Sequence, residues 1–261
     1  MELNCIQDAL GLIKSLESES KKALFRGHSK FEWDLMPSVG RCDQIFVNER
    51  SELEEFKKKI LHISKQFQNI EYFQEFGTND FSLLSWAQHY EMFPTRFLDW
   101  TDKILIALFF ACKDHLSCDG CVWMFIPSNN GDPCWKIREM KDDPLSFEEL
   151  KIFFVPIFID EWRGKIENKN FGNRRPQVQR SIMTIHPKDK AGAFESLERL
   201  MGSNSLVRIK VPLSSKNNLL KGLSDNYYIN QDTVLDGKTI QDIKSDRAWK
   251  IILQKKLALL H

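Results

Sequence analysis

The sequence has no long hydrophobic run and no excess of charge of either sign. Its longest clearly apolar run, Ile104 to Cys112, has nine residues, whereas a helix that spans a bilayer needs about 20. Lysine and arginine total 37 against 36 acidic residues, a net charge of +1, so no global field favours nucleic acid or a membrane as partner. The N-terminal segment is also unlike a signal peptide. These absences predict a cytoplasmic protein with no membrane partner.

Several familiar catalytic motifs are missing as well. The chain has no glycine-rich phosphate loop, P-loop lysine motif, nucleophile elbow or helical pair of zinc-binding histidines, which disfavours the common nucleotide-binding and hydrolase folds. The six cysteines are most simply interpreted as reduced thiols. A zinc site is an alternative, because Cys118 and Cys121 have the spacing of a zinc knuckle; its other ligands would be His115 and Cys134. No second close pair of cysteines supports it, so the sequence predicts no bound metal.

The composition is that of an ordinary globular protein. With 261 residues, 42% of them hydrophobic and 28% charged, the chain can bury a substantial core. Strands interspersed irregularly with helices predict an α+β fold. We predict one domain over residues 1–261, with a motif-bearing core at 22–211 and a helical part at 214–261. The expected strands are 22–27, 121–126, 152–159, 181–186 and 206–211, and the expected helices include 6–18, 103–114, 194–201, 215–224, 239–244 and 248–260.

A long amphipathic helix is predicted near residues 49–76. Apolar residues there recur at alternating spacings of three and four, beginning at Leu53, Phe56 and Ile60, which places them on one stripe of a helix. The opposite face is mostly charged and is most simply interpreted as solvated.

The most informative segment is a polar cluster that leads directly into an apolar run. The cluster consists of Gln88, His89, Thr95, Arg96, Asp99 and Thr101. The run at 103–114 is apolar on nearly all sides and is expected to be a buried helix with Thr101 or Asp102 as its N-cap. Polar side chains at the edge of a core either line a site or hold a buried network together.

Three blocks of sequence carry a family resemblance. The first is Phe25-Arg26-Gly27, the second is Trp86-Ala-Gln-His-Tyr90 with Pro94-Thr-Arg-Phe-Leu-Asp-Trp-Thr101 and Ala107-Leu-Phe-Phe-Ala111, and the third is 175–187. In this order they resemble the FRG-domain family, named for its Phe-Arg-Gly. The third block departs from the family pattern at Ser181 and Met183. The resemblance implies one FRG-type domain, a bacterial toxin or phage-defence setting, and an antitoxin or chaperone protein as partner.

A more distant similarity to ADP-ribosyltransferases implies a chemistry. Those enzymes have a strand that ends in arginine, a later strand bearing Ser-Thr-Ser that leads into an Ala-x-x-Phe-Ala helix, and a third strand opened by glutamate. Here Arg26, residues 98–111 and Gln179 occur in that order. The similarity implies a mixed or antiparallel β core of ADP-ribosyltransferase type, NAD as substrate, and RNA or protein as acceptor. It implies Arg26, His89, Asp99 and Gln179 as catalytic residues, and Arg26, Gly27, Thr95, Arg96 and Thr101 as residues that bind NAD.

The departure from that pattern is at Gln179, because an amide cannot serve as the carboxylate that takes a proton. Either Asp99, Glu91 or His89 supplies the carboxylate's role, or Gln179 only positions the substrate, or the chain is no transferase.

The rival interpretation is a non-catalytic module that binds nucleic acid or a protein partner and uses the polar cluster as a structural network. Arg26 would then simply pair with Asp99, and Arg174, Arg175 and Arg180 would be either a solvated turn or a patch that contacts phosphates. Metal-assisted hydrolysis of nucleic acid through His89, Asp99 and His115 has no tight ligand spacing and ranks last. The transferase hypothesis predicts that Arg26, Thr101 and Gln179 meet at one cavity.

Overall fold

The chain forms interspersed helices and strands, as an α+β fold requires. The computed structural model describes residues 1–41, 51–58, 83–84, 87–88, 93–126, 138–139, 157–160, 179–186, 196–201 and 206–235. Its elements are α1 (Ile6–Ser18), β1 (Leu24–His28), the 3₁₀ turn η1 (Ser38–Gly40), β2 (Phe97–Thr101), α5 (Ile104–Cys112), β3 (Gly120–Phe125), β4 (Arg138–Glu139), β5 (Ile157–Asp160), β6 (Ser181–Ile185), α7 (Leu197–Met201), β7 (Leu206–Val211), α8 (Leu213–Tyr227) and α9 (Gln231–Val234). In the described ranges, no helix is long and apolar enough to cross a membrane.

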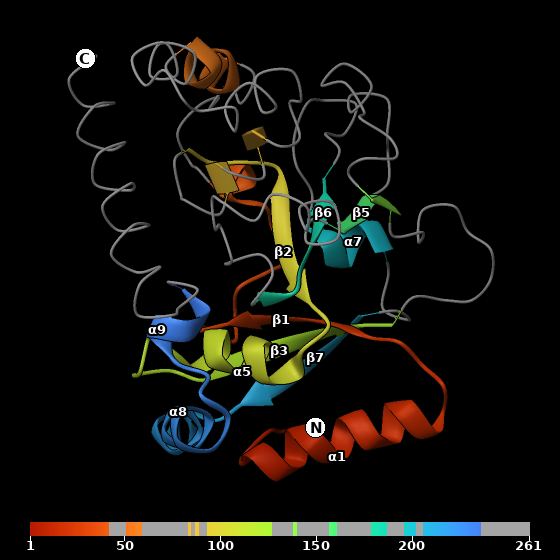
Figure 1. Ribbon diagram of the computed structural model, residues 1–261, viewed down its shortest axis with the longest axis vertical. Coiled ribbons are helices and arrows are strands. Elements are labelled where there is room, and N and C mark those ends of the chain that lie inside the picture. Colours follow the sequence, from red (N-terminus) through yellow and green to blue (C-terminus); the bar gives the residue numbers. More distant parts are fainter. Residues whose placement is uncertain are drawn as a thin grey trace, which may run out of the picture.

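The described strands form one sheet in the order β4-β5-β6-β2-β1-β3-β7. Neighbours are antiparallel except β4 and β5, which are parallel. β1 pairs with β3 along its whole length, from Leu24 to His28. With β2 it pairs only at Phe25 opposite Thr101. In Figure 1, β2 and β6 run across the direction of β1, β3 and β7. β1 and β2 therefore separate on leaving this single pair, and the sheet opens between them at its centre.

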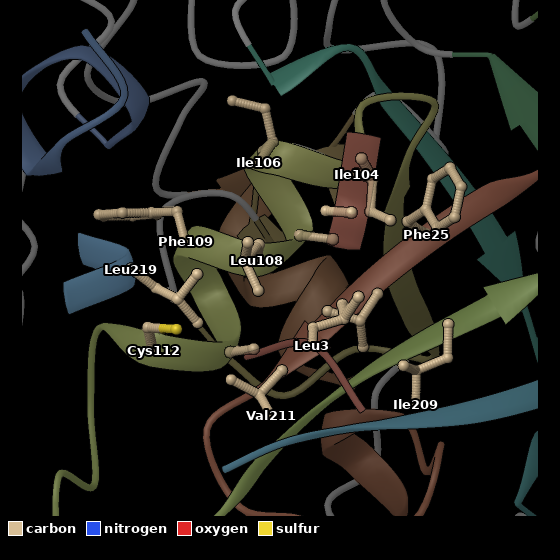
Figure 2. Packing of buried hydrophobic residues seen from close by; sticks show 14 of the residues in the cluster. Leu3, Phe25, Ile104, Ile106, Leu108, Phe109, Cys112, Ile209, Val211 and Leu219 are labelled. Atoms are coloured by element: carbon tan, nitrogen blue, oxygen red, sulfur yellow. The ribbon is translucent and has the colours of Figure 1, made fainter. Parts of the chain in front are cut away.

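Helices α1, α5 and α8 pack on one face of the sheet, where the larger core lies (Figures 1 and 2). Phe25 of β1 and Ile209 of β7 face Ile104 and Leu108 of α5 in this core (Figure 2). Most of α5 is buried, as its all-round apolar sequence predicts. On the opposite face a second cluster contains Leu24, Leu35, Leu98, Trp100, Cys121, Trp123, Phe125, Ile182, Leu197 and Leu206. Side chains of β1 therefore pack into a hydrophobic cluster on each face of the sheet.

Gly27 brings α5 into backbone contact with β1. A Cβ atom at this position would lie 1.9 Å from the carbonyl oxygen of Ala107 and 2.6 Å from the amide nitrogen of Ala111. No side chain fits there, because both obstacles are main-chain atoms of a buried helix. The glycine of the Phe-Arg-Gly triplet therefore sets the distance between β1 and α5.

The strand predictions at 121–126, 181–186 and 206–211 are confirmed as β3, β6 and β7. The expected stop of the first strand at Gly27 was wrong, since β1 continues to His28 and the glycine accommodates α5 instead. Of the strand predicted at 152–159, residues 157–159 lie in β5, and residues 152–156 lie outside the described residues.

The predicted N-cap of the buried helix was also wrong. Lys103 stands before Ile104, the first residue of α5, and makes no side-chain cap. Thr101 Oγ1 accepts a hydrogen bond from the Lys103 amide at 3.0 Å, which ties the end of β2 to the start of α5. Of the helix predicted at 49–76, residues 51–58 are helical. Its remainder, and the helices predicted at 239–244 and 248–260, lie outside the described residues.

Candidate functional site

A cavity of about 310 Å³ lies beside the opening between β1 and β2. Its wall includes Arg26, Gly27 and His28 of β1, Asp99 and Thr101 of β2, and Gln179 just before β6. One side of α5 contributes Ile106, Ala107 and Phe110. The volume is at the lower end of the range of about 300–1,000 Å³ that is usual for small-molecule sites. Arg26, Thr101 and Gln179 thus meet at one cavity although they are far apart in the sequence.

Arg26 bridges the two strands where they separate. Its Nη1 donates to the main-chain oxygen of Asp99 at 2.6 Å, and its Nε donates to His28 Nε2 at 3.0 Å. The guanidinium also lies 3.7 Å from Asp99 Oδ2. Burial lowers the pKa of Arg26 to about 10, although the charge of Asp99 opposes this shift. The group therefore stays cationic at neutral pH, and its Nη2 makes no hydrogen bond to a described residue.

His28 is held in its neutral form beside Arg26. Because Nε2 accepts the bond from Arg26, the ring proton is assigned to Nδ1, which lies 3.3 Å from the Trp33 carbonyl oxygen. Burial, together with the charges of Arg26 and Arg41, holds the pKa of His28 well below its ordinary value. The sequence interpretation missed His28. Its spacing of two residues from Arg26 on one strand was the available signal, since such residues share a face.

Asp99 is oriented by a short chain of side chains, of which Gln88 lines the cavity and Thr95 lies behind it. Thr95 Oγ1 donates to Gln88 Oε1 at 2.5 Å, and Gln88 Nε2 donates to Asp99 Oδ2 at 2.9 Å. Thr95 is fully buried, whereas the Asp99 side chain is 32% exposed. The second oxygen of Asp99, Oδ1, makes no hydrogen bond with the described residues although it is shielded from solvent. The carboxylate is thus fixed through one oxygen.

Gln179 and Thr101 offer hydrogen-bonding groups on the other parts of the wall. Gln179 Nε2 donates to the main-chain oxygen of Val234 at 2.9 Å, which leaves its Oε1 to accept. Thr101 accepts from the Lys103 amide, which leaves its hydroxyl proton to donate. Both side chains are largely buried, at 7% and 5% exposure. Their positions are therefore fixed before any ligand binds.

The remaining predicted residues lie elsewhere. Thr95 sits behind Gln88 and is not part of the wall, and Arg96 is 2% exposed and also lies outside it, with its carbonyl oxygen accepting from the His186 amide at 3.0 Å. His89 is outside the described residues. Arg180 forms an ion pair with Asp102 at 2.5 Å.

The alternative zinc site has one member in an unsuitable place. Cys121 is buried in β3, where desolvation raises its pKa to about 12 and keeps the thiol protonated. Cys134 lies outside the described residues. Among the residues that are described, no group of three or more candidate ligands could hold a metal ion.

The charges around the cavity favour an anionic ligand. Arg41 lines the same cavity as Arg26, and its positive charge contributes to the lowered pKa of both Arg26 and His28. Asp99 partly offsets the two guanidinium groups, while Asp114 is paired with Lys113. An anion between two guanidinium groups would relieve their repulsion and form charge-assisted hydrogen bonds.

Comparison with known proteins identifies the segment that carries this site. Neither the curated proteins nor the solved structures gave a match. The family model described as the FRG domain matches residues 21–120, which run from just before β1 to the first residue of β3. This segment supplies Arg26, Asp99 and the buried helix α5, whereas Gln179 lies beyond it. Over residues 21–120 the chain is therefore similar to the FRG domain.

Proposed function

We propose that the chain is an ADP-ribosyltransferase-like enzyme that transfers ADP-ribose from NAD to a macromolecule, with a β core of that type. The observation that carries the proposal is the meeting of Arg26, Thr101 and Gln179 at one cavity. The distant sequence similarity assigns these three positions to one site, and they lie far apart in the sequence, in β1, in β2 and just before β6. A purely structural role for each of them would not require a shared cavity.

The residues of the wall suit the chemical groups of NAD. Arg26 Nη2 and Arg41 are cations for the pyrophosphate. The hydroxyl of Thr101 and Oε1 of Gln179 are a donor and an acceptor for ribose hydroxyls or the carboxamide. Phe110, also in the wall, offers an aromatic surface to a planar ring. The volume of about 310 Å³ suits the nicotinamide and its ribose, with the rest of NAD extending outward.

The chemistry also matches a site of this kind. Departure of nicotinamide gives the ribose an oxocarbenium-like character, and enzymes stabilise such a state by position and electrostatics. Side chains that are already hydrogen-bonded to the scaffold, as Arg26, Asp99 and Gln179 are, lose little further freedom when substrate binds. The acceptor class, RNA or protein, enters the proposal only through the similarity to ADP-ribosyltransferases. A toxin or phage-defence role with an antitoxin or chaperone protein enters it only through the FRG resemblance.

The test is incubation of the purified chain with labelled NAD and cell RNA or cell protein. We expect label transfer and nicotinamide release with the wild type and neither with Arg26→Ala. Lys21→Ala is the control, because Lys21 is exposed and pairs with Glu19 away from the cavity wall. Absence of both transfer and nicotinamide release in the wild type would contradict the proposal.

A non-catalytic binding module is the second candidate, and the hydrogen-bond chain Thr95–Gln88–Asp99 with Arg26 favours it. Such a network can serve only to hold β1 and β2 together. This candidate predicts that Arg26→Ala and Asp99→Ala are unfolded, whereas a catalytic role predicts folded and inactive variants. Thermal melts of both variants distinguish the two.

A further inference from the structure

We propose that the Asp99 carboxylate accepts the acceptor's proton during transfer, and that Gln88 is the residue that positions it. This inference rests on the proposed transferase function. It assigns to β2 the carboxylate that the position of Gln179 lacks, and it gives a role to the chain Thr95–Gln88–Asp99.

A proton acceptor is needed because Gln179 cannot be one. Its amide is not basic, and its nitrogen is engaged with the Val234 carbonyl. Two carboxylates line the cavity among the described residues, Asp99 and Asp114. Asp114 is exposed and is paired with Lys113. Asp99 is therefore the better-placed carboxylate of the described wall, at the junction of β1, β2 and the cavity.

The hydrogen bonds around Asp99 orient it without exhausting its capacity to accept. Gln88 Nε2 bonds to Oδ2 at 2.9 Å, and Gln88 itself is fixed because its Oε1 accepts from Thr95 at 2.5 Å. Arg26 makes its close contact, 2.6 Å, with the Asp99 main chain and lies 3.7 Å from the carboxylate. Oδ1 has no hydrogen-bond partner among the described residues. A half-satisfied carboxylate costs stability, and such groups are typical of functional sites.

The step balances in atoms and electrons. The bond between C1′ of the ribose and the nicotinamide nitrogen breaks, and nicotinamide leaves with the bonding electron pair. A hydroxyl oxygen or an amine nitrogen of the acceptor forms the new bond to C1′. The proton of that group moves to the Asp99 carboxylate and passes to water after the product leaves.

The experiment compares the wild type with Asp99→Asn, Gln88→Glu and the control Asp225→Asn, which changes an exposed carboxylate of α8 outside the cavity wall, all in the full chain. NAD affinity is measured by calorimetry, folding by thermal melt, and nicotinamide release across a pH range with total cell RNA or cell protein added. For Asp99→Asn we expect NAD affinity within about threefold of the wild type, because the contact of Arg26 is to the main chain. Release should fall by about 100-fold or more, the typical contribution of a general base.

The pH dependence separates a catalytic carboxylate from a structural one. Gln88→Glu places a second carboxylate against Asp99 Oδ2, so the acidic limb of the rate profile should move to higher pH. The residual rate of Asp99→Asn should have no such limb, and Asp225→Asn should behave as the wild type. Release by Asp99→Asn at the wild-type rate would overturn the inference while the transferase function stands. A fall in nicotinamide release that only matches a loss of NAD binding or of folding would also overturn the inference. A wild type that releases no nicotinamide would overturn the proposed function itself.

Discussion

At the scale of single residues, Gln179 joins the cavity to the C-terminal part of the described chain. Its Nε2 donates to the carbonyl oxygen of Val234, the last residue of α9. This explains in physical terms why an amide suits the position. A glutamate there would place a carboxylate oxygen against a buried carbonyl oxygen, and neither can donate unless the acid is protonated.

We therefore expect Gln179→Glu to lower the free energy of unfolding by about 1–3 kcal/mol at neutral pH, the cost of an unsatisfied buried polar group. The loss should shrink at a pH low enough to protonate the new carboxyl. Urea denaturation at both pH values measures it, with Gln231→Glu as an exposed control. A fully stable Gln179→Glu variant would show that the contact with Val234 is unimportant.

His186 predicts a loss of stability in acid. Thr184 Oγ1 accepts from Trp100 Nε1 at 3.0 Å and lies 3.1 Å from His186 Nε2, an arrangement that suits a neutral imidazole. Burial, aided by the charges of Arg26 and Arg96, lowers the pKa of His186 to about 3, whereas an unfolded histidine has a pKa of about 6.5. Between these values the unfolded chain binds the proton and the folded chain does not.

Stability contributed by neutral His186 is thus present above about pH 6.5 and is lost as the pH falls toward about 3. We expect His186→Gln to reduce the slope of unfolding free energy against pH by about 1.4 kcal/mol per pH unit in this window. Chemical denaturation at a series of pH values tests it, with the exposed His115 changed to glutamine as control. An unchanged slope in His186→Gln would contradict the prediction.

At the scale of elements, the contact between β1 and α5 depends on Gly27. A Cβ atom added at this residue would lie only 1.9 Å from the Ala107 carbonyl oxygen, and this clash can be relieved only by moving α5 away from the sheet. That movement would break the larger core and the cavity wall together.

Gly27→Ala should therefore cost about 3 kcal/mol or more, at the upper end of overpacking effects, or prevent folding. Gly11→Ala is the matched control, because a Cβ at Gly11 in α1 meets nothing within 4 Å. That change should stabilise the chain by up to about 1 kcal/mol through helix propensity. Melting temperatures of the two variants should shift in opposite directions; a harmless Gly27→Ala would refute the close approach.

Lys216 ties α8 to the end of α5 beside the cavity. The side chain is 1% exposed, and its Nζ donates to the carbonyl oxygens of Ser29 at 2.7 Å, His115 at 3.0 Å and Asp114 at 3.3 Å. Three acceptors compensate for the buried charge.

Replacement of this charge with an apolar group removes a donor from all three carbonyl groups, of which only that of His115 still accepts from a backbone amide of the described residues, that of Cys118. Lys216→Met should lower the free energy of unfolding by about 2–3 kcal/mol, whereas Lys221→Met, on the exposed side of the same helix, should change it by less than about 0.5 kcal/mol. Urea denaturation compares the two. Equal effects would mean that the buried hydrogen bonds contribute little.

At the scale of the whole molecule, the sequence predicts the elements better than their assembly. β3, β6 and β7 follow from short hydrophobic runs, and α5 from its apolar residues on all sides. The opening of the sheet between β1 and β2 was not predictable, because strand pairing depends on contacts between distant segments and leaves no local pattern.

The same reason limits the prediction of the site. Arg26, Asp99, Thr101 and Gln179 were placed in one site through the distant similarity to ADP-ribosyltransferases, and all four line the cavity. Thr95 was expected to bind NAD but lies behind Gln88, because a sequence motif does not tell a wall residue from its support. His28 carries no motif of its own, and it contacts Arg26 because β1 continues past Gly27, so that both residues share one face of the strand.

The central claim is that the cavity at Arg26, Thr101 and Gln179 uses NAD for transfer to a macromolecule. The most direct measurement is nicotinamide release from NAD by the purified chain, with cell RNA or cell protein present, for the wild type and for Arg26→Lys. Lysine keeps the charge but cannot bridge Asp99, His28 and a phosphate at once. The account predicts release and label transfer by the wild type and at least about a tenfold loss in a folded Arg26→Lys variant. No release by the folded wild type, or equal release by both proteins, would contradict it.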